Sequence, residues 1–205
     1  IYQDEFGRMW FATRDGLNNY DGNEIKAYRP IPGDLTSLPK ANIRMITGDN
    51  NGCLYLQTTS SVVAFDMKKE VFKEILKDGN GAIGKSKNGI WIGFKSDLYL
   101  YNPAKEELKL VTNLGYKTLE IFTVFETSNT VCLVGTNKGL ISLDSNLTLK
   151  TYFTDSEIRD IYEDKYKNLW ICSSNKGLIL LKKDGSVKYF QHDERNAYSL
   201  INNFV

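Results

Sequence analysis

The chain has 205 residues, of which 41% are hydrophobic and 25% are charged. A chain of this length buries about 70% of its unfolded surface, so it needs no disulfide or metal for stability. The balance of 26 basic against 25 acidic residues argues against a polybasic nucleic-acid binder and an acidic tail protein. No run of 18 apolar residues occurs, so we expect no membrane contact by this segment. Because the chain begins at Ile1, we expect it to be a piece of a longer protein.

Five similar segments follow one another along the chain, each with an apolar anchor residue. The anchors are Trp10, Tyr55, Trp91, Leu133 and Trp170. Their spacings of 45, 36, 42 and 37 residues average 40, which is the period of a four-stranded propeller blade. We therefore predict an all-β fold, a β-propeller fragment of about five four-stranded blades. It would form part of a larger, seven-bladed propeller.

The predicted blade units have the following limits. They span residues 1–39, 40–77, 78–117, 118–156 and 157–197, and residues 198–205 start the next inner strand.

Each unit is predicted to contain four strands in chain order. A short inner strand, such as residues 43–46 or 158–161, is followed by a turn of the form Asp-x-x-Gly. The aspartate accepts backbone N–H bonds there, and the glycine adopts positive φ. The anchor strand and a third strand follow, joined by a small polar turn such as residues 13–16. The outer strand, as in residues 24–28, alternates apolar and charged residues, which indicates one solvated face.

The cysteines and the histidine point to no metal or cofactor. Cys53, Cys132 and Cys172 lie in apolar stretches without a Cys-x-x-Cys pair, so we expect small buried side chains on strands. The single histidine, His192, lies in a polar turn, where we expect a solvated loop residue. One histidine cannot build a multi-histidine metal site. We therefore predict no metal site and no cofactor.

The repeat pattern resembles a known family. Residues 4–21 read Asp-x-x-Gly-x-ϕ-Trp-ϕ-Ala-Thr-x-x-Gly-Leu-x-x-Tyr-Asp, where ϕ is apolar, and this closely resembles the two-component regulator propeller repeat. Residues 164–181 match with one extra residue before Gly177, and the copies around Trp91 and Leu133 match less well. The linker at residues 32–43 is also typical of the family, and residues 193–204 echo it.

The resemblance implies a function. Proteins with these repeats look like the periplasmic sensor regions of bacterial hybrid two-component systems, which combine a sensor histidine kinase with a response regulator. In that family the propellers precede a transmembrane helix in the inner membrane and the kinase. Many members respond to oligosaccharides released from glycans and regulate polysaccharide use. We therefore expect a periplasmic sensor segment that recognises a ligand and is not itself an enzyme.

A ligand is expected at the rim that the turns between second and third strands share with the connections between blades. Cations there would suit an acidic sugar. An exposed tyrosine in one connection would stack on a sugar ring. The candidates are Arg14, Lys95, Lys138 and Lys176 in the turns, Arg44 and Arg159 on inner strands, and Tyr116 in a connection. The turn cations could instead be merely solvated, and each inner arginine could pair with Asp160 or another carboxylate.

Two other functions are compatible with the sequence. The segment could be a scaffold or dimerisation module whose ligand binds elsewhere. It could also be a propeller lyase or glycosidase, for which Asp15, Glu120 and Asp160 are available as carboxylates, although the sequence does not show which of them pair.

The chain ends lead to a prediction about partners. Ile1 aligns with Ile46 near the end of an inner strand, and residues 203–205 align with residues 42–44 at the start of one. The ends could meet in a small five-bladed ring, or the chain could be an arc of a larger propeller, which we favour. An arc exposes two apolar blade faces. We therefore expect self-association or association with the remaining blades of the parent protein.

Overall fold

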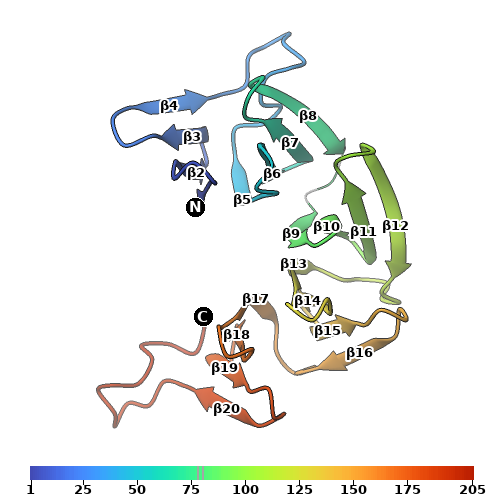
Figure 1. Ribbon diagram of the computed structural model, residues 1–205. Helices are drawn as coiled ribbons and strands as arrows, with labels where there is room; N and C mark the ends of the chain where they lie inside the picture. The colour runs from blue at the N-terminus through green and yellow to red at the C-terminus, as the bar shows by residue number, and fades with distance from the viewer. Residues whose placement is uncertain (78, 80) are drawn as a thin grey trace. The chain divides into compact units, whose positions relative to one another are not determined.

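The computed structural model describes residues 1–77, 79 and 81–205. These residues form five four-stranded antiparallel sheets and contain no helix, which confirms the predicted all-β fold (Figure 1). No segment within these ranges is a helix of the length and apolar character needed to cross a membrane. The predicted blade limit at residue 78 lies outside the described residues.

The chain forms two compact units. The first comprises Ile1–Phe94 and Leu100–Lys109, and the second comprises Lys95–Tyr99 and Leu110–Val205. Two sheets lie in the first unit and consist of β1 (Tyr2–Gln3), β2 (Met9–Thr13), β3 (Gly16–Tyr20) and β4 (Ile25–Tyr28), then β5 (Ile43–Gly48), β6 (Cys53–Thr58), β7 (Val62–Asp66) and β8 (Val71–Leu76).

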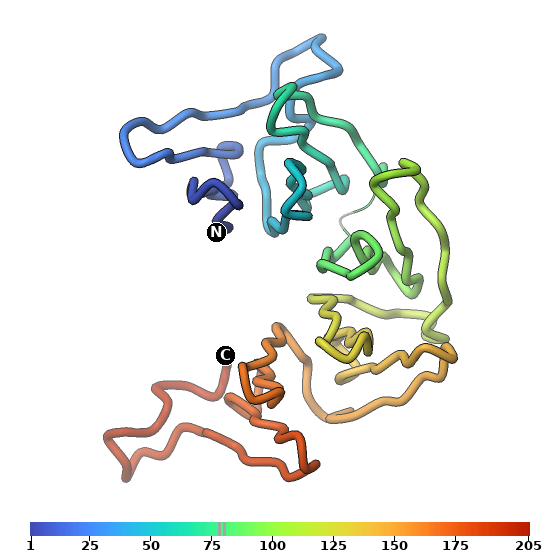
Figure 2. The backbone as a smooth tube through the Cα atoms, in the orientation of Figure 1, coloured from blue at the N-terminus to red at the C-terminus, as the bar shows by residue number. Residues whose placement is uncertain are grey.

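The third sheet has residues in both units and consists of β9 (Ala82–Ser86), β10 (Gly89–Phe94), β11 (Asp97–Asn102) and β12 (Glu107–Asn113). The last two sheets lie in the second unit and consist of β13 (Ile121–Glu126), β14 (Cys132–Thr136), β15 (Gly139–Leu143) and β16 (Leu149–Tyr152), then β17 (Ile158–Glu163), β18 (Leu169–Ser173), β19 (Leu178–Leu181) and β20 (Val187–Phe190). In every sheet the strands pair in chain order, as a propeller blade requires (Figures 1 and 2).

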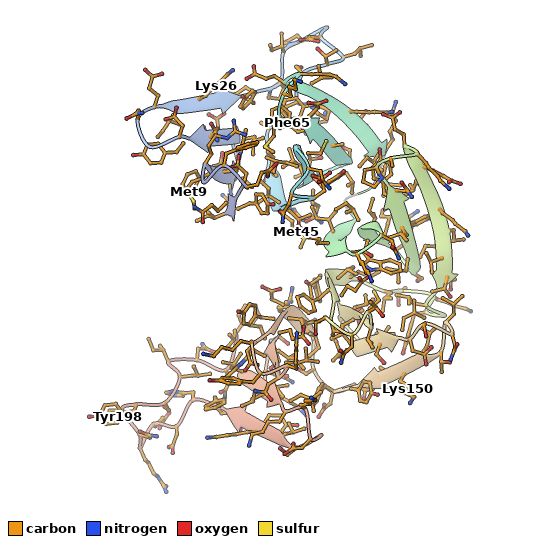
Figure 3. All side chains as sticks on the ribbon, viewed as in Figure 1. Met9, Lys26, Met45, Phe65, Lys150 and Tyr198 are labelled. Atoms are coloured by element: carbon orange, nitrogen blue, oxygen red, sulfur yellow. The ribbon has the colours of Figure 1, made fainter. Side chains whose placement is uncertain are left out.

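Apolar side chains fill the space between neighbouring sheets within each unit. In the first unit Trp10, Phe65 and Phe72 form an aromatic core, in which the ring centroids of Phe65 and Phe72 are 4.3 Å apart. Figure 3 labels Phe65 at this packed face. In the second unit Leu140 and Ile171 belong to an aliphatic core. Burial of each such side chain contributes about 1.5–3 kcal/mol, so these contacts fix how adjoining sheets pack.

The turn aspartates explain why the anchor is a tryptophan or tyrosine in three of the five sheets, at Trp10, Tyr55 and Trp170. Asp4 Oδ1 accepts the backbone N–H groups of Phe6 and Arg8, and its Oδ2 accepts the indole N–H of Trp10 at 2.8 Å. Gly7 adopts φ +82°, as predicted for this position. The same bonds recur from Asp164 to the indole of Trp170, at 3.1 Å. The aspartate thus closes the turn and provides the partner that a buried indole N–H needs.

The turns between second and third strands are also built alike. The last residue of the second strand is a hydroxyl residue whose Oγ donates to the carbonyl three or four residues later, at 2.8–3.0 Å, in Thr13, Thr58, Thr136 and Ser173. In three of these turns the accepting residue is a glycine with positive φ, namely Gly16, Gly139 and Gly177. A Cβ at Gly139 would lie 2.5 Å from the carbonyl oxygen of Tyr152, so only glycine fits.

The cysteines and the histidine lie broadly where the sequence placed them. Cys132 is buried, whereas Cys53 and Cys172 are only half-buried, and all three are free thiols on strands. His192 is exposed in a loop, and its Nδ1 lies 2.7 Å from the carbonyl oxygen of Leu200.

Candidate ligand-binding rim

The turns after second strands and the connections between sheets share one edge, as predicted. Backbone hydrogen bonds of 2.7–3.1 Å join four of these turns to a connection. The pairs are Ser60 with Gly79 in the first unit, and Ser96 with Leu114, Asn137 with Glu120, and Ser174 with Glu157 in the second. The rim predicted as a ligand site is therefore an ordered surface in each unit.

Three inner strands carry a β-bulge at the same position. The pairing of β5 with β6 shifts between Ile43 and Met45, and equivalent shifts occur in β13 and β17. The bulged residues are Arg44, Phe122 and Arg159. A bulge re-aims a side chain relative to the regular pleat and is common beside functional sites. Both inner-strand arginines that the sequence singled out thus occupy bulges.

Arg159 lies in a mixed polar and aromatic setting in the second unit. Its guanidinium carbon is 3.9 Å from the ring centroid of Phe122, the bulged residue of the adjoining sheet, and 5.6 Å from that of Phe204. Arg159 also forms an ion pair with Glu157, not with Asp160. Its Nε is buried without a hydrogen-bond partner, which is unusual for a donor in a native structure.

Lys176 also has a carboxylate partner. It forms an ion pair with Asp155, in the connection that precedes β17. The same connection is bound to the turn through Ser156, whose Oγ donates to Asn175 Oδ1 at 2.5 Å. Residues 155–157 therefore supply a carboxylate to Arg159 and another to Lys176, because the connection runs directly beside the turn. The rim here carries paired charges rather than an uncompensated positive patch.

The remaining candidates are distributed over both units. Arg14 and Arg44 are exposed in the first unit, and Lys95 and Lys138 are exposed in turns of the second. Tyr116 is only half-buried, so it retains some exposed surface. Its hydroxyl lies 3.4 Å from Thr151 Oγ1, and its carbonyl accepts a hydrogen bond from the hydroxyl of Ser96.

Two of the three carboxylates considered for catalysis, Asp15 and Asp160, have local partners. Asp15 is held by Arg29, with Oδ2 2.7 Å from Nη2, and this pair holds the pKa of the Asp15 carboxyl below its usual value. Asp160 accepts the backbone N–H of Ile161 at 2.8 Å. In the described ranges, no group of three His, Cys, Asp or Glu residues is arranged to hold a metal ion.

Hollows occur at other places on the units. One of about 550 Å³ lies between residues 30–39 and β8, and one of about 540 Å³ lies among the first-to-second turns near Asp49 and Lys85. A smaller one of about 240 Å³ lies near Thr127 and Lys182 in the second unit. None of the seven predicted site residues lines these three hollows.

Phe122 and Glu157 were missed by the sequence reasoning. Phe122 aligns with Arg44 and Arg159 once the inner strands are superposed, so its place was available from the repeat. The repeat did not predict that Phe122 contacts Arg159, because an aromatic residue on a strand is expected to pack in a core. Together, Arg159, Glu157 and Phe122 offer a hydrogen-bond donor, an acceptor and an apolar face, which is the set that a hydroxylated ring needs.

The sheets and their rim define a β-propeller. The extracellular domain of a protein assigned to a hybrid two-component system of Bacteroides thetaiotaomicron superposes over 100% of this chain and 36% of its own, with a TM-score of 0.57 and 19% identity. A catalytically inactive virginiamycin B lyase from Staphylococcus aureus, solved with quinupristin, superposes over 96% of this chain and 70% of its own, with a TM-score of 0.77 and 14% identity. At these identities the similarity establishes the fold alone.

Sequence comparison identifies the repeat itself. The family model described as two component regulator propeller matches residues 152–175, which include β17. A protein named histidine kinase P4, from Formosa agariphila, is 53% identical over 38 residues, which are 18% of this chain and 3% of that kinase. The chain carries the two-component regulator propeller repeat, and the resemblance seen in its motifs is confirmed. It spans about a third of the two-component chain it superposes on.

Proposed function

We propose that this chain is the ligand-recognising segment of an extracytoplasmic sensor propeller in a hybrid two-component signalling protein. The observation that carries the proposal is the repeat match at residues 152–175, combined with the propeller fold. We place the segment in the periplasm, as the sensor region of an inner-membrane protein. The signal would be a glycan-derived oligosaccharide, and the output would regulate polysaccharide use.

The ligand surface we favour is the rim around Arg159. The Arg159 guanidinium and the Glu157 carboxylate would hydrogen bond to sugar hydroxyl groups, and Phe122 would contact a ring face. Because Arg159 and Lys176 are already paired with carboxylates, this surface fits a neutral or weakly acidic sugar better than a polyanion. Lys138 and Tyr116 would extend the surface over neighbouring parts of the second unit.

The test is a calorimetric titration of the chain with a panel of neutral and acidic oligosaccharides, followed by variants. For an oligosaccharide that binds the unmodified chain, Arg159→Ala should weaken the binding at least tenfold, which corresponds to about 1.4 kcal/mol. The matched control Lys109→Ala removes an exposed cation from outer strand β12, away from the rim, and should leave affinity unchanged. A panel without binding, or equal losses in both variants, would contradict the proposed surface.

The alternative is a propeller that serves as a scaffold or dimerisation module while the ligand binds elsewhere in the parent. The same titration distinguishes the two, because a scaffold would bind none of the sugars and yet associate with itself. A lyase or glycosidase activity is a third candidate, weaker because Asp15 and Asp160 have local partners. Turnover of a bound oligosaccharide by this chain would favour it.

A further inference from the structure

A hollow of about 240 Å³ lies between the last two sheets, β13–β16 and β17–β20 (Figure 1), and its lining residues all belong to the second unit. It lies among the turns between first and second strands, at the opposite end of the strands from the rim. Its more deeply buried lining is aliphatic and consists of Val131, Leu133, Leu169 and Leu181. A ligand in this hollow would therefore be separate from any ligand at the rim.

The corresponding place between the first two sheets is filled by large side chains. The ring of Trp10 packs on Phe65 of the second sheet, with centroids 5.7 Å apart. Arg8 reaches the same sheet, because its Nη2 lies 3.5 Å from the sulfur of Met67 while its Nε donates to Asp4 Oδ2 at 2.7 Å. Aromatic rings and an arginine thus close this part of the interface between sheets.

Smaller side chains hold the same repeat positions in the last two sheets. The positions follow from the distance of each residue from its anchor and from the pairing of second with third strands. The replacements are Trp10 by Leu133, Arg8 by Val131 and Phe65 by Leu181. Because protein interfaces of this kind otherwise pack closely, the lost side-chain volume accounts for the hollow and for its aliphatic lining.

The same alignment also reverses the charge at this place. In the first two sheets the aligned positions include two carboxylates and a neutral methionine, and the residues that replace them are neutral or basic. The replacements are Asp4 by Thr127, Asp66 by Lys182 and Met67 by Lys183. Two acidic side chains are lost and two basic ones are gained, so the change is in charge as well as in volume.

Lysines dominate the polar part of the lining. Lys167, in the turn before β18, lines the hollow together with Lys182 and Lys183, and all three are exposed. Among the described residues of the lining, Glu163 is the only acidic one, and it is engaged by Ser128, from which it accepts the backbone N–H at 2.8 Å and the hydroxyl at 2.9 Å. Three lysines against one engaged glutamate give the hollow a positive charge.

An aliphatic wall beside ammonium groups defines the chemistry of a ligand. Leu169 and Leu181 are half-buried, so each retains surface that a hydrocarbon group could cover. A lysine is a compact charge on a flexible stem, which suits it to follow a carboxylate at the mouth of the hollow. A volume of about 240 Å³ corresponds to about eight water molecules, so the ligand would be a small molecule and not a polymer.

We propose that this hollow is a binding site for a small aliphatic carboxylate. The hydrocarbon part would lie against Leu169 and Leu181, and the carboxylate would accept hydrogen bonds from the ammonium groups of Lys182 and Lys183. Lys167 would add a further positive charge on the side of the inner turn. The proposal goes beyond the function proposed for the rim and does not depend on it.

The test is a titration of the chain with cyclohexanecarboxylate at millimolar concentrations, followed by backbone amide NMR shifts. The shifts should saturate and should be largest around Lys167 and Lys183. Cyclohexanecarboxamide has almost the same shape without the charge, and it should bind at least tenfold more weakly because a hydrogen bond between charged groups is lost. Inorganic phosphate, which has charge without a hydrocarbon part, should also bind more weakly. Equal affinities for the carboxylate and either of these probes would contradict the proposed chemistry.

Variants then locate the site. Lys183→Glu should weaken the binding of cyclohexanecarboxylate at least tenfold. Lys165→Glu is the matched control, because it makes the same charge change at an exposed residue of the same sheet that does not line the hollow, and it should change affinity less than twofold. Val131→Met extends a neutral, flexible side chain into the space, so it should abolish binding without any change in charge.

The outcomes separate this site from the rim. Arg159→Ala should leave the binding of cyclohexanecarboxylate unchanged, whatever it does to an oligosaccharide. If Val131→Met fails to fold, the two exposed lysine variants and the neutral amide still decide the question. The absence of a saturable shift, equal losses in Lys183→Glu and Lys165→Glu, or full binding by a folded Val131→Met would each overturn the proposal.

Discussion

Replacing Asp4 with asparagine tests whether the aspartate–tryptophan pair of the repeat stabilises the fold. The Asp4 side chain is fully buried and accepts four hydrogen bonds, two from backbone N–H groups and two from the Arg8 Nε and the Trp10 indole. Asp4→Asn keeps the carbonyl oxygen for the backbone groups but turns an NH₂ group toward the other two donors. The indole of Trp10, 1% exposed, cannot turn to water for a replacement.

The magnitude follows from those two donors. A buried donor left without a partner costs about 1–3 kcal/mol, and a partly exposed ion pair contributes at most about 1 kcal/mol. We therefore expect Asp4→Asn to lower the free energy of unfolding by about 3 kcal/mol. In the Trp10→Phe background the indole N–H is absent, so the same substitution should cost about 1.5 kcal/mol less.

The assay is equilibrium unfolding in urea followed by circular dichroism. Asp164→Asn should cost less than Asp4→Asn, because Trp170 is only half-buried and its neighbour is Asn168 rather than an arginine. Asp184→Asn, at an exposed turn, should change stability little. If Asp4→Asn were as mild as Asp184→Asn, or if the Trp10→Phe background made no difference, the indole bond would not be what stabilises the turn.

The remaining predictions concern pH, a glycine and the thiols. Burial opposes ionisation of Asp4, but hydrogen bonds from neighbouring side chains and backbone hold the pKa of its carboxyl below the usual value. Its contribution to stability is therefore full above about pH 4 and is lost as the pH falls through the folded-state pKa. The urea midpoint should fall between pH 7 and pH 3 in the unmodified chain, and it should fall less in Asp4→Asn. Gly139→Ala should lower Tm more than Gly22→Ala, because both have positive φ but only the first would place a Cβ against a carbonyl; equal shifts would contradict the crowding argument. Burial raises the pKa of the Cys53 thiol to about 11 and also raises that of Cys132, so both should react slowly with a disulfide reagent at pH 8 until urea unfolds the chain, and prompt labelling of the folded chain would show that they are accessible.

The repeat made most of the fold predictable. The 40-residue period and the turn residues gave the number of sheets, the strand order and the positions of Trp10 and Trp170 on second strands. These features depend on local bonding, such as the bonds from Asp4 to residues two, four and six positions later, and local bonding is visible in a single sequence. The turn that contains Thr136 and Gly139 was predictable for the same reason, because its hydrogen bond is also local.

The candidate site was predicted less completely, because its partners come from neighbouring repeats. The sequence placed Arg159 and Lys176 near the rim but could not tell that residues 155–157 neutralise both. That result depends on how closely a connection runs beside a turn, which the bond between Ser174 and Glu157 now fixes. Phe122 reaches Arg159 only because both are bulged residues of adjoining inner strands.

The bulge separates the constant part of this repeat from its variable part. The turn aspartate and the hydroxyl residue recur because each bonds a backbone or indole group, and the glycine recurs because a Cβ would clash there, so we expect substitution at any of them to cost stability. The bulged position makes no such bond, and it holds Arg44 in one sheet, Phe122 in another and Arg159 in a third. A position that the scaffold leaves unconstrained is free to vary with a ligand, and the three residues all lie at the rim end of inner strands. Under the proposed function, specificity would therefore change at the bulges without any change in the turns that hold the sheets together.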